Sequence, residues 1–123
     1  MAQGGRVLVV GSINMDLVFR ADRVPEEGET LLGREFRQVP GGKGANQAVA
    51  AARLAGRVRM IGRVGDDAAG AELVEALSGV GVDVTHVRRT SSLTTGVALI
   101  AVQRDGQNQI VVAPGANARL APA

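Results

Sequence analysis

The sequence predicts an α/β fold in which a parallel sheet carries flanking helices. Short β-branched runs alternate with helical patterns over residues 6–87, which is typical of a sheet built from strand–helix–strand units. The 123 residues are 46% hydrophobic and only 2% aromatic, so the core has to consist of Val, Ile, Leu and Ala. Such a core suits closely packed α/β layers. A chain of this length forms one small domain or part of a larger one.

The first part of the chain predicts a strand and a polar flap. Residues 6–11 (RVLVVG) are apolar on both faces, which predicts a buried central strand. A strand-like pattern resumes at residues 17–20. Residues 22–39 are polar and rich in turn formers, so we expect a small hairpin or flap there, with extended pieces around 30–32 and 35–37.

A helix, a strand and a second helix follow. Residues 44–55 are apolar almost all round, which predicts a helix buried between a sheet and another layer and ended by Gly56. Residues 57–65 predict a strand, after which Asp66 or Asp67 caps the second helix. Five apolar residues are expected on the core-facing side of that helix: Ala69, Leu73, Ala76, Leu77 and Val80.

The pattern changes in the last third of the chain. Residues 82–87 predict a further strand, and residues 96–102 and 109–113 flank Asp105-Gly106, which is a strong hairpin signal. Leu120 marks the expected beginning of another helix. We therefore expect this chain to be the N-terminal half of a larger fold, with marginal stability or a tendency to aggregate on its own.

The composition disfavours several kinds of function. The formal charge of +2 comes from scattered arginines, and the scarcity of aromatic rings argues against nucleic-acid binding. Without cysteine, neither disulfides nor thiolate metal sites can form. The apolar runs are too short to span a bilayer, and the N-terminal residues do not look like a secretion signal. We expect a cytoplasmic protein that binds neither nucleic acid nor membrane.

Asn14 and Asp16 are the first candidate binding residues. They lie two positions apart at the end of the first strand, so in extended backbone their side chains face the same side. Ligands of open α/β sheets bind beyond the carboxyl ends of the strands. A carboxylate that accepts hydroxyl hydrogens, beside an amide that donates and accepts, suits a polyol with vicinal hydroxyls. The alternative is that both side chains merely satisfy the N–H groups of a turn.

Residues 40–48 (PGGKGANQA) form the most distinctive motif. Gly42 and Gly44 stand where a helix begins, and exposed N–H groups beside a flexible ammonium make a site for an oxygen-rich ligand. The spacing matches neither the phosphate-binding P-loop nor the dinucleotide G-x-G-x-x-G motif. The glycines alone could serve only tight packing. Lys43, the only lysine, and Asn46 lie three residues apart and face one point, which packing does not explain.

Other polar residues carry weaker signals. Asp66 and Asp67 could be imagined as a metal pair, but helix capping is favoured, so no metal site is predicted. His86, the only histidine, is expected on the surface. Thr94 and Thr95 either contact a ligand or lead into the next strand, and the sequence does not decide between the two.

Together these residues resemble the N-terminal part of the ribokinase branch of the PfkB carbohydrate kinases. The resemblance covers essentially the whole chain, residues 1–123. It rests on six motifs: residues 11–16 (GSINMD), 28–30 (GET), 41–48 (GGKGANQA), 65–70 (GDDAAG), 95–100 (TGVALI) and 115–117 (GAN). The family's second signature, a Gly-Ala-Gly-Asp stretch that supplies the catalytic base, does not occur in this sequence.

The resemblance implies a ribokinase-like sheet with a small β-lid built from segments about 17–40 and 95–113. It implies an ATP-dependent kinase that converts D-ribose to D-ribose 5-phosphate and, as the complete enzyme, forms a homodimer through its lid. This chain alone would be inactive. ATP, Mg²⁺ and a monovalent cation would bind outside this chain, and no catalytic residue would lie in it. The alternative is a non-catalytic sugar-binding module or a fragment that interacts through its lid. The implied substrate-binding residues are Asn14, Met15, Asp16, Gly42, Lys43, Gly44, Ala45, Asn46, Ile100 and Ile110.

Overall fold

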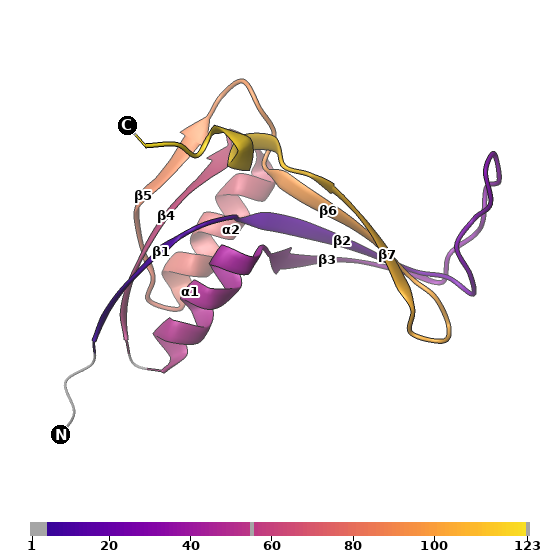
Figure 1. The fold of residues 1–123 in the computed structure, drawn as a ribbon, viewed down its shortest axis with the longest axis horizontal. Coiled ribbons are helices and arrows are strands. Elements are labelled where there is room, and N and C mark those ends of the chain that lie inside the picture. The colour runs from indigo at the N-terminus through magenta and orange to yellow at the C-terminus, as the bar shows by residue number, and fades with distance from the viewer. Residues whose placement is uncertain (1–4, 55, 123) are drawn as a thin grey trace.

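Two sheets organise the computed structural model, which describes residues 5–54 and 56–122 (Figure 1). The first, called the core sheet below, holds three parallel strands in the order β1-β4-β5. The second, called the outer sheet, has the order β3-β2-β6-β7 and extends to one side of the core sheet. The core strands are β1 (Arg6–Val10), β4 (Arg57–Gly65) and β5 (Asp83–Thr90).

The outer sheet is mixed. Its central pair, β2 (Asn14–Arg20) and β6 (Gly96–Val102), runs parallel, while β3 (Glu35–Gly41) and β7 (Asn108–Ala113) join the two edges antiparallel. The predicted hairpin between β6 and β7 is confirmed, and Gly106 adopts the positive φ of 87° that its turn requires.

Helices α1 (Lys43–Arg53) and α2 (Ala68–Gly79) lie on one face of the core sheet (Figure 1). Alternation along β4 explains why: its even-numbered residues point to the helices and are buried, while the odd-numbered arginines point away. One continuous core results. It consists of Val9, Ile13, Met15, Ala45, Ala48, Val58, Met60, Val64, Leu73, Leu77 and Val82.

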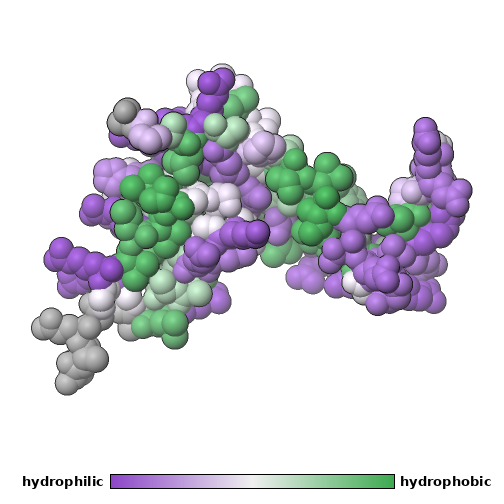
Figure 2. Space-filling view, in the orientation of Figure 1, coloured by the Kyte–Doolittle hydropathy of each residue, from purple (hydrophilic) through white to green (hydrophobic). Residues whose placement is uncertain are grey.

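Among the described strands, residues 6–11 do not form the buried central strand that was predicted. β1 lies at an edge of the core sheet, where β4 is its only partner among the described strands. Among the described residues, the segment 115–122 borders the face away from the helices, but it leaves Leu8 and Val10 58% and 61% exposed. Figure 2 shows the corresponding hydrophobic patch over β1 and β4. Apolar residues on both faces of a strand are buried only where both faces are covered.

The helix predicted at residues 44–55 is present but is buried on one side only. Gly44, Ala45 and Ala48 face the core, whereas Leu54, which follows the last helical residue, is 84% exposed. Ala55 lies outside the described residues. The prediction of burial on both sides is wrong because small alanines leave little apolar area in water, so a second covering layer is not required.

Two further expectations differ from the structure. Residues 30–32 form no strand, because the flap turns at Gly28, whose φ is 78°, and is held by an exposed Arg23–Glu29 ion pair. A 3₁₀ helix that was not predicted, η1 (Gly115–Arg119), precedes Leu120, and Leu120, the expected start of a helix, is extended. No helix in the described part of the chain is long and apolar enough to cross a membrane.

Candidate functional site

The first turn of α1 is pressed against the connection between β1 and β2. Gly42 has a φ of 95°, and a Cβ there would lie 2.6 Å from the carbonyl oxygen of Ser12. A Cβ on Gly44 would lie 2.8 Å from backbone atoms of Gly11. The N–H of Ala45 donates to the Ser12 carbonyl at 3.0 Å. Both glycines are therefore required for this close approach of backbone to backbone.

The same turn leaves hydrogen-bond donors free. The capping residue, Gly42, has no side chain to accept them, and within the described residues the N–H groups of Lys43 and Gly44 have no hydrogen-bond partner. The side chain of Lys43 is exposed at the same end of the helix. Helix N-termini with free N–H groups and a nearby cation attract anionic or oxygen-rich ligands. The structure thus keeps the donors that the motif predicted.

Asp16 lies beside this helix start. It pairs with Val39 across the β2–β3 ladder, and its carboxylate occupies the space that a Cβ on the neighbouring Gly41 would fill. Partial burial raises the pKa of Asp16 above its usual value, because burial disfavours the charged form. Asn14, two residues earlier, points to the same face of β2. The pair therefore offers an acceptor and an amide at the start of α1.

The strand register extends this face across the outer sheet. Ile100 pairs with Val18 on one side and with Ile110 on the other. Paired residues project to the same side of a sheet, and Val18 shares the face of Asn14 and Asp16. Ile100 and Ile110 thus form an apolar surface on the same face of the sheet as Asn14 and Asp16.

Met15 and Ala45 differ from the other predicted site residues. Met15 is 2% exposed and Ala45 is also buried, and both side chains belong to the hydrophobic core. Their side chains are directed away from the face that carries Asn14. The structure thus groups Asn14, Asp16, Gly42 and Gly44, with Lys43 and Asn46 exposed on the first turn of α1. Met15 and Ala45 instead pack in the hydrophobic core beneath this group.

Asn117 was not predicted as a site residue, yet it touches one. Its Nδ2 donates to Oδ1 of Asn14 at 2.7 Å and to the carbonyl oxygen of Ile13 at 3.1 Å, while its Oδ1 accepts from the Ile13 N–H at 3.0 Å. The residues lie more than 100 positions apart in the sequence, so no local pattern links them. The motif of residues 115–117 marked the segment but not this contact.

The remaining polar candidates have structural roles. Thr95 is buried, and its hydroxyl donates to Asp67 and accepts from the Gly65 N–H. Asp67 caps α2 by accepting from the Gly70 N–H at 2.8 Å, which confirms the capping prediction. The described residues contain no group of three acidic, histidine or cysteine side chains that could hold a metal ion. His86 is exposed, as expected.

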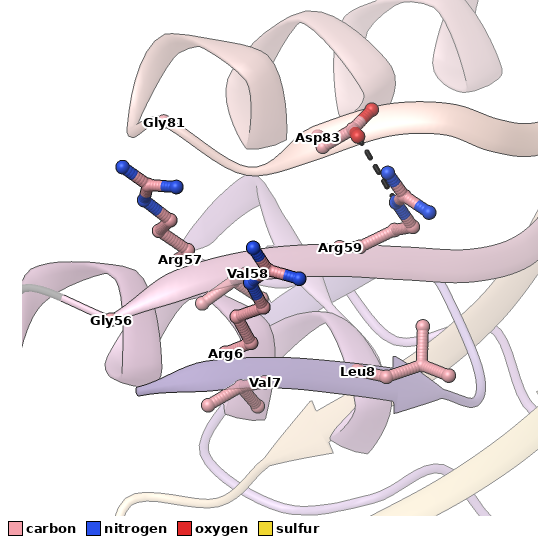
Figure 3. A pocket seen from close by; sticks show the side chains of 9 residues that line it. All are labelled: Arg6, Val7, Leu8, Gly56, Arg57, Val58, Arg59, Gly81 and Asp83. Carbon is pink, nitrogen blue, oxygen red and sulfur yellow. Dashed lines mark hydrogen bonds and ion pairs between the residues drawn. The ribbon is translucent and has the colours of Figure 1, made fainter. Parts of the chain in front are cut away.

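A hollow of about 690 Å³ lies elsewhere, on the open face of the core sheet (Figure 3). Arg6 from β1 and Arg57 and Arg59 from β4 project on this face, and Arg59 pairs with Asp83 at 3.1 Å. The hollow sits at the amino ends of β1 and β4. Because ligands of parallel sheets bind beyond the carboxyl ends, this hollow is not the site that Asn14 and Asp16 form.

Comparison with known proteins decides the family. Residues 5–123 match the pfkB family of carbohydrate kinases. The chain belongs to the pfkB carbohydrate kinase family. The resemblance found in the motifs is thereby confirmed, and so is the α/β fold class.

Individual pfkB relatives share both sequence and fold with the chain. Ribokinase of Bacillus subtilis is 48% identical over 117 residues, which are 95% of this chain and 40% of the relative. Deoxyribokinase of Salmonella typhi is 40% identical over 116 residues, which are 94% of this chain and 38% of the relative. The solved structure of Arabidopsis thaliana ribokinase complexed with ribose and ATP superimposes with a TM-score of 0.84 at 41% identity, covering 94% of this chain and 38% of that one. The chain thus spans about 40% of the length of these relatives and corresponds to their N-terminal part.

Proposed function

We propose that this chain is the sugar-binding part of a ribokinase-type enzyme that transfers a phosphoryl group from ATP to D-ribose. The observation that carries the proposal is the convergence of Asn14 and Asp16 with the glycine-rich start of α1. The ribokinase relatives support ribose as the sugar, and the Arabidopsis relative was solved with ribose and ATP. We prefer this function to a non-catalytic sugar-binding module because the relatives named above are kinases by name.

The chemistry of the site assigns each residue a task. The Asp16 carboxylate accepts hydrogens from sugar hydroxyls, and the free N–H groups of Lys43 and Gly44 donate to hydroxyl oxygens. The Lys43 and Asn46 side chains reach the ligand from the first turn of α1. Ile100 and Ile110 offer an apolar surface to the carbon side of the sugar ring. Orientation of the reacting hydroxyl is the contribution of this chain to catalysis.

Phosphoryl transfer also needs charge neutralisation around the phosphates. The described residues contain no acidic or histidine cluster for a metal ion, and the sequence contains no Gly-Ala-Gly-Asp stretch. We therefore expect ATP, Mg²⁺ and the monovalent cation to bind in the region of the relatives that this chain does not span. A kinase that consumes ATP acts where ATP is abundant, so we expect it in the cytoplasm.

Calorimetric titration with D-ribose tests the proposal. The chain is expected to bind D-ribose, and Asp16→Ala is expected to abolish the binding heat because the hydroxyl acceptor is lost. Asp66→Ala is the matched control, since it removes an exposed carboxylate that pairs with Arg89, away from the site. Identical heats for wild type and Asp16→Ala would contradict the proposal. ADP release from ATP and ribose is expected to be undetectable for the chain alone.

The outer sheet is the proposed dimer contact of this enzyme. Phe19, Leu99 and Val111 share the face opposite Asn14, and Val111 is 67% exposed. Phe19 also stacks on Phe36, with ring centroids 4.8 Å apart. Leu99 and Phe36 on the same face are 44% and 50% exposed. Exposed apolar patches of this kind mark protein contacts.

Light scattering after size-exclusion chromatography tests the contact. Leu99→Asp is expected to convert dimers to monomers, because it places a charge in the apolar patch. Leu54→Asp introduces the same charge at an exposed leucine next to α1 and is expected to leave the oligomeric state unchanged. A monomeric wild type would contradict this proposal without affecting the sugar site.

A further inference from the structure

Ile13 has an unusual backbone environment. It connects β1 to β2, it is fully buried, and pairing among the described strands supplies no partner for its N–H and C=O groups. Buried backbone groups need hydrogen-bond partners. The side-chain amide of Asn117 satisfies both groups at once, at 3.0 Å and 3.1 Å.

This double contact fixes the orientation of the Asn117 amide. The two ends of an asparagine amide are nearly the same size, so packing alone does not distinguish oxygen from nitrogen. Here the Ile13 N–H requires an oxygen and the Ile13 C=O requires an N–H. The nitrogen of Asn117 therefore lies on the side of Asn14, and its second hydrogen points to Asn14 Oδ1 at 2.7 Å.

The orientation of Asn14 follows in turn. An N–H donor from Asn117 must meet the oxygen of the Asn14 amide, so Nδ2 of Asn14 remains for other partners. We propose that Asn117 is a positioning residue that makes Asn14 a hydrogen-bond donor to the sugar. Asn14 then donates to the oxygen of a ligand hydroxyl, while Asp16 accepts the hydrogen of that hydroxyl or of its neighbour. This assignment rests on the proposed sugar-binding function.

Gly96 keeps the contact between the two asparagines open. It pairs with Asn14 in the β2–β6 ladder. A Cβ at this position would lie 2.5 Å from Asn14 Oδ1 and would overlap Asn117 Nδ2. A side chain at residue 96 would therefore separate donor from acceptor. The Ile13 backbone thus fixes which end of the Asn117 amide donates, and Gly96 leaves room for that donor to reach Asn14.

Asn117→Asp tests this direction, because a carboxylate has the shape of the amide but no N–H. It still accepts from the Ile13 N–H, but it cannot donate to Asn14. The Asn14 amide is then expected to turn over, donate Nδ2 to the introduced carboxylate, and present its oxygen to the sugar. We expect D-ribose affinity to fall about tenfold.

Asn14→Ala provides the double-mutant comparison. If Asn117 acts through Asn14, Asn117→Asp causes no further loss of ribose affinity when Asn14 is already alanine. Val58→Ala is the control for stability, since it removes buried volume in the core sheet, outside the site, and is expected to leave affinity unchanged. If the loss of ribose affinity in the double variant equals the product of the losses in the two single variants, the proposal is overturned.

Nuclear magnetic resonance of the ligand-free protein separates this proposal from the proposed function. In the wild type the side-chain N–H groups of Asn117 are expected to exchange slowly with water and those of Asn14 quickly, because only the former are hydrogen-bonded. In Asn117→Asp the Asn14 signals are expected to shift downfield and exchange slowly. Fast exchange at Asn117 in the wild type would overturn the inference even if Asn117→Asp fails to fold. If the side-chain N–H groups of Asn117 and Asn14 exchange as expected but the protein does not bind ribose, only the proposed function is contradicted.

Discussion

The carboxylate of Asp67 accepts two hydrogen bonds from Thr95, one from its backbone N–H at 2.9 Å and one from its hydroxyl at 2.6 Å. The same carboxylate caps α2 through Gly70, and the Thr95 hydroxyl accepts from the N–H of Gly65 at 2.9 Å. Thr95 precedes β6 of the outer sheet, whereas Gly65 ends β4 of the core sheet. One side chain thus connects both sheets and a helix.

Replacement of Asp67 is expected to lower the free energy of unfolding by more than the loss of an ordinary helix cap does. Asp67→Ala removes the cap and leaves the buried Thr95 hydroxyl and N–H without their acceptor, so we expect a loss of about 2–3 kcal/mol in the free energy of unfolding. Urea denaturation measures it. Asp66→Ala, next in the chain, breaks only an exposed ion pair with Arg89 and is expected to change stability by less than about 0.5 kcal/mol. Equal effects of the two variants would contradict the assignment.

The contribution of Asp67 is expected to depend on pH. Burial alone would raise the pKa of Asp67, but hydrogen bonds from Thr95 and Gly70 outweigh it and hold the pKa below the usual 3.8. A lowered folded-state pKa means that the contribution is complete above 3.8 and disappears as the pH falls through the folded-state value. The stability difference between wild type and Asp67→Ala should therefore be constant from pH 7 to 5 and shrink below 3.8. A difference that does not decrease at all as the pH is lowered below 3.8 would contradict this.

Glycine-to-alanine substitutions at two positions are expected to change the free energy of unfolding in opposite directions. Gly42→Ala meets both a positive φ and the Ser12 carbonyl, so we expect a loss of at least about 2 kcal/mol together with loss of ribose binding. Gly79, the last residue of α2, has open space around it, and Gly79→Ala is expected to add about 0.5 kcal/mol. Thermal melts of both variants give the comparison. Stabilisation by Gly42→Ala would show that the close approach is not required.

Ribose affinity is expected to fall on acidification. Hydroxyl hydrogens are accepted by the charged form of Asp16, whose pKa is raised by burial. Affinity should be constant well above that pKa and decrease as the pH falls through it, starting at a higher pH than for an ordinary aspartate. Calorimetry between pH 7 and 4 measures the decrease. Asp16→Asn should bind weakly at every pH and show no such dependence.

The open face of the core sheet predicts poor solution behaviour that can be improved. Val10→Thr places a hydroxyl on an exposed β-branched side chain, so aggregation should decrease while unfolding free energy changes by less than about 0.5 kcal/mol. Val9→Thr is the matched control on the buried face and is expected to lose about 1–3 kcal/mol. Light scattering and urea titration distinguish the two effects.

Local signals in the sequence were sufficient for part of the fold. The cap at Asp67 and the turn at Gly106 are each determined by a few neighbouring residues, and both predictions are confirmed. The common face of Asn14 and Asp16 follows from the two-residue period of a strand. These features do not depend on what the rest of the chain does.

Features that depend on distant partners could not be predicted. The exposure of Val10 depends on how much of the core sheet other elements cover, which the strand itself does not encode. The alignment of Ile100 with Val18 is a matter of register between strands far apart in the chain. The contact of Asn117 with Asn14 has no local pattern at all.

That contact also has a consequence for the order in which the molecule is made. Asn14 and Asn117 are separated by 103 positions, and β2 acquires its central partner only when β6 exists. A growing chain can complete the three described strands of the core sheet and both helices after Thr90 has been synthesised, whereas the two asparagines meet only after residue 117 has been added. Closing such a long loop is slow relative to local structure. The arrangement that orients Asn14 for a sugar should therefore form later than the core sheet and its two helices.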